Sequence, residues 1–286
     1  MLQCLPPVPD AIPELPDYLR ASGRISLTFE FGADRTRLAA LAEAGGFRAK
    51  FPKANTARAE AIIVNTAGGM TGGDSLGVEL AVEKGASALV TTQAAEKIYK
   101  SLAGTTSVST RLALGPGSDT IWAPQETILY DKARLVRSLE AQIDPSATAL
   151  ICESIVFGRL AHGESLANCA FHDRWRIRCG GKLIFADDVR LRGAISDALD
   201  RPAIGKGARA IATVLLVAPG AEERIEQARA ALVDASLHAV CQCAASALPG
   251  FVLARFLSAE PHGLRMALNH YLSTFADVKI PRSWNC

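Results

Sequence analysis

The chain has 286 residues, 49% of them hydrophobic, which is enough to bury the core of one large domain or two. Its 31 Lys and Arg against 29 Asp and Glu give a net charge of +2, which argues against a nucleic-acid-binding protein. The apolar runs fall short of the ~18 residues of a membrane-spanning helix, and the proline-broken start lacks the basic segment of a secretory signal. We therefore predict a cytoplasmic protein with no nucleic-acid and no membrane partner.

The chain divides into a proline-rich lead-in, residues 1–22, and a predicted single domain, residues 23–286. Short strand-like segments separated by glycine and proline turns fill most of the domain, without the rhythm of a βαβ protein. Apolar stripes at helical spacing predict two helices in the last quarter, over 219–235 and 261–276. The expected fold is mainly β, antiparallel or coil-like, with two late α-helices.

The most unusual segment is residues 66–74, which place two glycine pairs between two strand-like runs. A phosphate-binding loop has Lys and then Ser or Thr after its last glycine, whereas here Asp74 follows and brings the wrong charge. Residues 76–83 then alternate apolar and polar, which predicts a strand and not the helix N-terminus that holds a dinucleotide. We interpret the segment as a tight turn between strands that presents Asp74.

One acidic residue lies in strongly apolar surroundings. Glu153 shares a strand face with Ile151 and Ile155, so its carboxylate is expected to point into the core, where an unpaired charge is costly. Two interpretations remain open: an ion pair with an arginine such as Arg159 or Arg190, or a wet internal passage lined by the carboxylate. Asp74 and Glu164 pose the same choice. Oxygen ligands that do not form a complete coordination set suit a cation in transit better than a stored one.

The cysteines and histidines give weaker signals. Seven scattered cysteines, an odd number, indicate reduced thiols. Cys241 and Cys243 would share a strand face, and two buried thiols are favoured over a metal store because no further ligand pair accompanies them. The five histidines are dispersed, and no hydrolase motif is present, so catalysis is not predicted. A hydrolase or transferase with an unrecognised site near the glycine-rich segment and His162 remains the alternative.

Five blocks of sequence, taken together and in this order, resemble the urease accessory protein UreD family, also called UreH. The blocks are residues 67–74, 91–101, 122–126, 157–159 with 163–164, and 281–284. The residues that carry the resemblance are Gly68, Gly69, Gly72, Gly73, Trp122, Pro124, Gln125, Gly158, Arg159, Gly163, Pro281, Arg282 and Trp284. The resemblance covers nearly the whole chain from about residue 23, and Ser75 and Ser283 are small departures from the family pattern.

The resemblance implies an elongated β-helix-like domain with helices near the C-terminus. It further implies a non-enzymatic scaffold that binds the urease apoprotein and the accessory protein UreF, which recruits the nickel-carrying GTPase UreG. No cofactor is then expected to bind tightly, because nickel would only pass through on its way to the urease active site. With this family in view, our hypothesis is that Asp74, Glu153 and Glu164 line or flank a nickel-conducting interior.

Overall fold

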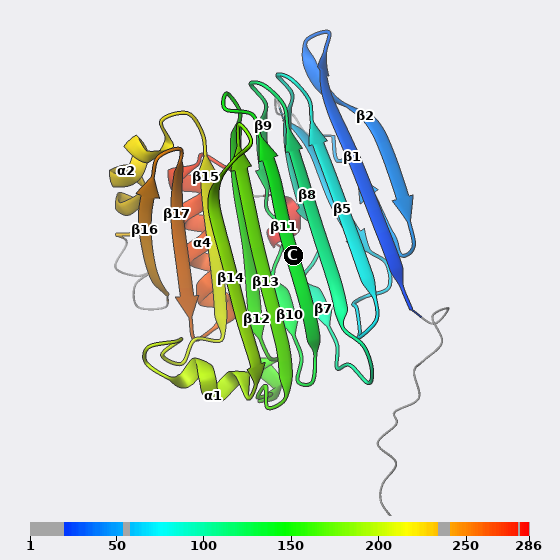
Figure 1. Ribbon diagram of the computed structural model, residues 1–286, viewed down its shortest axis with the longest axis vertical. Coiled ribbons are helices and arrows are strands. Elements are labelled where there is room, and N and C mark those ends of the chain that lie inside the picture. The colour runs from blue at the N-terminus through cyan, green and yellow to red at the C-terminus, as the bar shows by residue number, and fades with distance from the viewer. Residues whose placement is uncertain (1–19, 54–57, 234–240, 280, 286) are drawn as a thin grey trace, which may run out of the picture.

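The computed structural model describes residues 20–53, 58–233, 241–279 and 281–285 (Figure 1). Most of the predicted lead-in, residues 1–19, lies outside the described residues, and the first strand begins at Ser22. The division into a lead-in and a single domain stays a prediction. None of the helices in the described part of the chain is long and apolar enough to cross a membrane.

Two large β-sheets pack face to face. The seven-stranded sheet has the order β14 (Lys182–Gly193), β13 (Cys169–Cys179), β11 (Arg134–Ile143), β8 (Thr106–Leu114), β5 (Ser75–Val82), β1 (Ser22–Gly32) and β2 (Arg35–Ala44). The ten-stranded sheet runs β16 (Gln242–Leu248), β17 (Phe251–Ser258), β15 (Ala210–Val217), β12 (Thr148–Phe157), β9 (Asp119–Trp122), β6 (Ser87–Thr92), β4 (Ala59–Asn65) and β3 (Phe47–Lys50). The short strands β7 (Glu96–Ile98) and β10 (Thr127–Leu129) join it beside β12.

The central strands wind as a solenoid. From β4 to β13 the chain passes back and forth between the two sheets, with the short strands β7 and β10 inserted in the ten-stranded one. Each return adds a long strand parallel to the previous one in the same sheet. Antiparallel hairpins close the ends, such as β1 with β2 and β13 with β14. The β-helix-like arrangement that the resemblance implied is therefore confirmed.

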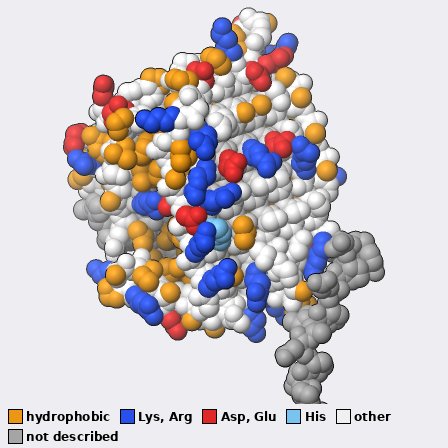
Figure 2. Space-filling model, in the orientation of Figure 1, with side chains coloured by type: hydrophobic (Ala, Val, Ile, Leu, Met, Phe, Trp, Pro, Cys, Tyr) orange, Lys and Arg blue, Asp and Glu red, His pale blue; other side chains and the backbone are white. Residues whose placement is uncertain are grey.

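Strands whose side chains alternate between buried and partly exposed supply the core between the sheets. In β5, Leu76, Val78, Leu80 and Val82 are buried, and the residues between them are half-buried, which confirms the predicted strand. The opposite face of the seven-stranded sheet is charged: Figure 2 shows basic and acidic side chains across its middle. Many of them form surface ion pairs, such as Arg24 with Glu79 at 2.7 Å. Exposed pairs of this kind contribute little to stability.

A helical layer covers the outer face of the ten-stranded sheet. The predicted helix 261–276 is confirmed as α4 (Pro261–Phe275), which buries Leu268 and Tyr271 against this sheet (Figure 1). The predicted helix 219–235 is shorter than expected: a 3₁₀ turn at Ala221–Arg224 precedes α2 (Ile225–Ala230). Of the predicted apolar stripe, Ala228, Ala231 and Leu232 are buried and Ile225 is half-buried. Residues 231–232 form a turn after the helix, and 234–235 lie outside the described residues. A third helix, α1 (Ile195–Asp200), was not predicted.

Candidate functional site

The glycine-rich segment is a close-packed connection from β4 to β5. The backbone N–H of Met70 donates to the Lys97 carbonyl, and Tyr99 N–H donates to the Met70 carbonyl, both at 2.8 Å. A Cβ atom added at Gly69 would lie 2.5 Å from the Tyr99 ring, and one added at Gly72 would lie 1.9 Å from Ser101 Oγ. These glycines are needed because the loop presses against residues 97–101.

Asp74 stabilises the turn that it ends. One carboxylate oxygen accepts a hydrogen bond from the Ala21 N–H and the other accepts one from the Thr71 N–H, each at 2.8 Å. The side chain is buried, and it ties the glycine-rich segment to the start of β1. Its oxygens are thus committed to backbone groups, and they do not line the cavity described below.

Glu164 and Arg159 form a second braced turn. Arg159 donates to the Glu164 carboxylate at 2.9 Å and lies over the ring of Tyr130, 4.4 Å from its centroid. Tyr130 meets Tyr99 edge to face, and the Tyr99 hydroxyl donates to the carbonyl of Gly68. Bonds from Arg159 keep the pKa of Glu164 below its usual range. Two of the motif blocks are therefore connected to the glycine-rich segment through ring contacts.

The C-terminal motif is bonded to the second and third blocks. The side-chain amide of Gln125 donates to the carbonyls of Gln93 and Ser283, at 2.7 and 2.8 Å. The indole N–H of Trp284 donates to the Thr91 hydroxyl at 2.9 Å. This last bond joins residues that are 193 positions apart in the sequence, so distant segments of the chain meet on one side of the molecule.

The remaining motif residues lie in the same connections. Pro281 is buried and Arg282 is exposed at the 3₁₀ turn Arg282–Asn285. Gly158 and Gly163 flank the 3₁₀ turn Leu160–His162, and the N–H of Gly158 donates to the Leu129 carbonyl.

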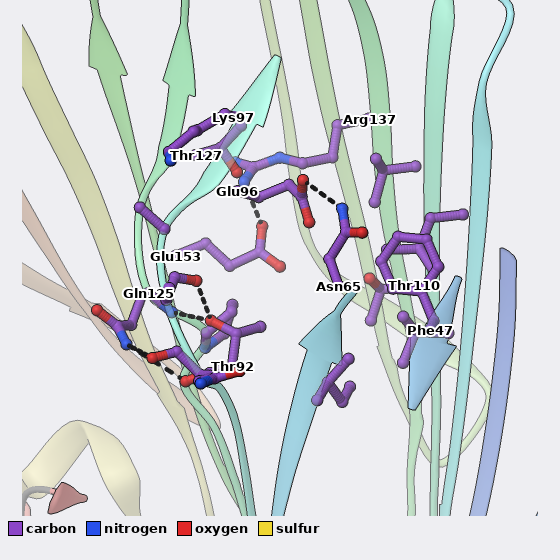
Figure 3. A pocket seen from close by; sticks show the side chains of 18 of the residues that line it. Phe47, Asn65, Thr92, Glu96, Lys97, Thr110, Gln125, Thr127, Arg137 and Glu153 are labelled. Carbon is purple, nitrogen blue, oxygen red and sulfur yellow. Dashed lines mark hydrogen bonds and ion pairs between the residues drawn. The ribbon is translucent and has the colours of Figure 1, made fainter. Parts of the chain in front are cut away.

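A cavity of about 160 Å³ lies between the two sheets, beside these connections (Figure 3). Three of the motif blocks line it through Gly68, Thr92, Gln93, Ala94, Ala95, Glu96, Lys97, Trp122, Pro124 and Gln125. Asn65, Arg137 and Glu153 add polar groups, and Phe47, Leu76 and Val78 add apolar ones. The cavity is large enough for several water molecules or for a hydrated ion.

Glu153 enters this cavity as part of a buried charge cluster. The Trp122 indole N–H donates to one of its oxygens at 2.8 Å, and Arg137 lies 3.2 Å from the other. Arg137 also forms a two-pronged ion pair with Asp173, at 3.0 and 2.6 Å. Glu153 therefore has both properties between which the sequence left a choice: it is ion-paired, and it lines an internal cavity.

The prediction that Arg159 or Arg190 forms an ion pair with Glu153 was wrong. Arg159 pairs with Glu164, and Arg190 pairs with Asp188 on the outer surface at 2.9 Å. The true partner, Arg137, lies on β11 in the opposite sheet. Its side chain crosses the interior to reach β12, a contact that strand alternation alone does not reveal.

The charged groups that line the cavity are two carboxylates and two cationic side chains. Glu96 and Glu153 line it together with Arg137 and Lys97 (Figure 3). Arg137 is shared with Asp173, which does not line this cavity. Burial raises the pKa of Glu153, and it raises the pKa of Glu96 to about 7, although the Asn65 amide, 2.8 Å away, lowers it. Sequence reasoning missed Glu96 as a site residue, although the residue lies inside the motif block 91–101.

The structure gives less support to a metal store at Cys241 and Cys243 or to a catalytic His162. Cys241 is buried and Cys243 half-buried, and burial raises the pKa of Cys241 to about 12, so that its thiol keeps its proton. Within the described residues, no three His, Cys, Asp or Glu side chains are placed to hold a metal ion. His162 is exposed on its 3₁₀ turn and does not line the cavity.

Comparison with known proteins identifies the family. Residues 21–285 match the family model described as UreD urease accessory protein. Urease accessory protein UreD 1 of Methylobacterium radiotolerans is 45% identical over 282 residues, covering 97% of this chain and 96% of the relative. UreD 2 of Methylorubrum populi is 47% identical over 87% of this chain and 84% of its own length. UreD of Azorhizobium caulinodans is 40% identical over 94% of this chain and 98% of its own length. The chain therefore belongs to the UreD family of urease accessory proteins.

Proposed function

We propose that this chain is a non-enzymatic scaffold for urease maturation, which binds the urease apoprotein and UreF and receives UreG through UreF. In this proposal nickel passes through the space between the two sheets and is never stored there. Family membership supports the general role, because the relatives are named urease accessory proteins. The protein is proposed to work in the cytoplasm, where these partners would meet it.

The observation that carries the nickel path is the internal cavity with two carboxylates, Glu96 and Glu153, in its lining. A space lined by Glu96, Glu153 and Arg137, with the hydroxyls of Thr92 and Thr127, offers hard oxygen ligands to a cation. Its apolar walls give few further ligands, so an ion would be held weakly and could move on. Of the three carboxylates expected from the sequence, Glu153 is retained in the proposal, Glu96 joins it, and Asp74 and Glu164 are left as turn residues.

The alternative of a hydrolase or transferase gains no supporting observation. It would need a nucleophile with a base near the glycine-rich segment. In the structure the polar groups of that segment bond to Tyr99, Ala21 and residues 97–100, and His162 is exposed on a separate turn. We therefore keep the scaffold as the single proposed function.

Nickel occupancy of urease matured in cells tests the proposal. Glu153→Gln keeps the size of the side chain and an acceptor for Trp122 but removes the charge, so nickel per urease active site should fall several-fold. Glu83→Gln, on an exposed turn residue, is the matched control and should leave occupancy unchanged. Unchanged occupancy with Glu153→Gln, while the complex still forms, would remove this residue from the path.

A further inference from the structure

A single pair of side chains separates two cavities. Arg137 and Glu153 line the main cavity of about 160 Å³, and they also line a smaller one of about 30 Å³ on their other side. The smaller cavity is lined further by Asp173 and by Asp187, which pairs with Arg255 at 2.7 Å near the surface. Arg137 and Glu153 thus form a partition between the two spaces.

The guanidinium of Arg137 occupies the place of a bridging cation. It lies between two carboxylates, 3.2 Å from Glu153 and 2.6 Å from Asp173, and only 8% of its side chain is exposed. The Glu153 oxygen that faces it accepts no hydrogen bond, and its side chain is only 4% exposed. A buried carboxylate oxygen without a hydrogen bond is uncommon, and here the ion pair with Arg137 takes its place.

We propose that Arg137 is a tethered cation that closes the passage, and that Glu153 and Asp173 form a latent divalent-cation site beneath it. The inference rests on the proposed function, since it supplies the gate of the same path. When the guanidinium moves into the main cavity, the two carboxylates are left without the cation that lay between them. The gate and the passing ion are therefore mutually exclusive occupants.

Charge balance explains why such a gate would favour a divalent ion. At the two carboxylates, the guanidinium leaves a net charge of −1 and a divalent ion leaves none. The displaced guanidinium then lies in the main cavity, whose lining includes the Glu96 carboxyl. Opening without an ion would leave two buried carboxylates facing each other, which is strongly unfavourable. The neighbouring cavity of about 160 Å³ has room for the displaced guanidinium.

Direct metal binding to the purified full-length chain tests the gate. In Arg137→Met the tethered cation is absent, so titration calorimetry with Ni²⁺ should show one site per chain, at least about tenfold tighter than in the unmodified protein. Adding Glu153→Gln to this variant should abolish the gained site. A folded Arg137→Met chain that binds Ni²⁺ no better than the unmodified protein would overturn the proposal, as would a gained site that survives Glu153→Gln.

A second variant decides the question if Arg137→Met does not fold. Arg137→Lys keeps a positive charge but cannot form the two-pronged bond to Asp173, so it should be displaced more easily. Its Ni²⁺ affinity should exceed that of the unmodified protein, and an equal affinity would overturn the gate. Neither titration involves urease, so a nickel path that fails the occupancy test and a gate that fails the binding test give different results.

Discussion

Glu96 is a carboxyl of the cavity whose pKa is raised by burial. Burial raises its pKa to about 7, above that of a glutamate in the unfolded chain. The folded state therefore binds an extra proton between about pH 4 and pH 7, and stability falls as pH rises through this window. The cost of burying the ionised carboxylate is fully present only above the folded-state pKa.

Glu96→Gln is expected to remove this cost while keeping the bond from Asn65. The stability that the substitution adds should be about 2 kcal/mol greater at about pH 8 than at about pH 5. Denaturant unfolding of both chains at the two pH values measures the difference. An equal effect at both values would show that the Glu96 carboxyl titrates normally in the folded protein.

Single residues also mark the limit of sequence reasoning at the site. The position of Glu153 on the inward face of its strand was predictable, because its neighbours Ile151 and Ile155 are apolar and strand residues alternate. Its pairing with Arg137 was not, because this contact joins two sheets and depends on how the strands stack. The hydrogen bonds of Asp74 were unpredictable for a related reason: the sequence does not show that a turn carboxylate accepts from distant backbone N–H groups such as that of Ala21.

At the scale of elements, the connection from β4 to β5 depends on glycine for space. A methyl group at Gly72 would meet Ser101 Oγ at 1.9 Å and the Ala103 carbonyl at 2.5 Å, so the loop or residues 101–103 must shift. Gly72→Ala should therefore lower the free energy of unfolding by about 1–3 kcal/mol. Gly77→Ala on β5 is the matched control, because its Cβ would meet only Ser109 at 3.8 Å.

Thermal or denaturant unfolding of the two variants distinguishes a steric role from general glycine effects. The control should be neutral or slightly stabilising, since alanine is less flexible than glycine in the unfolded chain. Equal effects of the two substitutions would contradict the close packing of the glycine-rich segment against residues 97–103.

Individual strands and helices were more predictable from the sequence than the way in which the strands pair. Alternation gave β5, and the apolar stripe gave α4, because both patterns follow from local geometry. The short helix α1 was missed, since six residues carry too little periodicity to stand out. The parallel pairing of β5 with β1 and β8 leaves the same alternation as an antiparallel hairpin would, so only the family resemblance pointed to the solenoid.

At the scale of the whole molecule, the solenoid brings the motif blocks together on one side, around the cavity. Trp284 reaches Thr91, and Gln125 reaches Ser283, so the C-terminal segment is bonded to the turns of the ten-stranded sheet. The family resemblance is thus concentrated around the interior cavity and the loops that frame it. A charged outer face and a helical layer remain as the surfaces that partners could meet (Figures 1 and 2).

Partner capture tests the central claim of a scaffold most directly. The tagged full-length chain is expressed with UreF, UreG and the urease subunits, and the proteins retained with it are identified and quantified. The account predicts that UreF and the urease apoprotein are retained, and that UreG is retained only when UreF is present. Retention of neither UreF nor urease by a folded chain would contradict the proposed role.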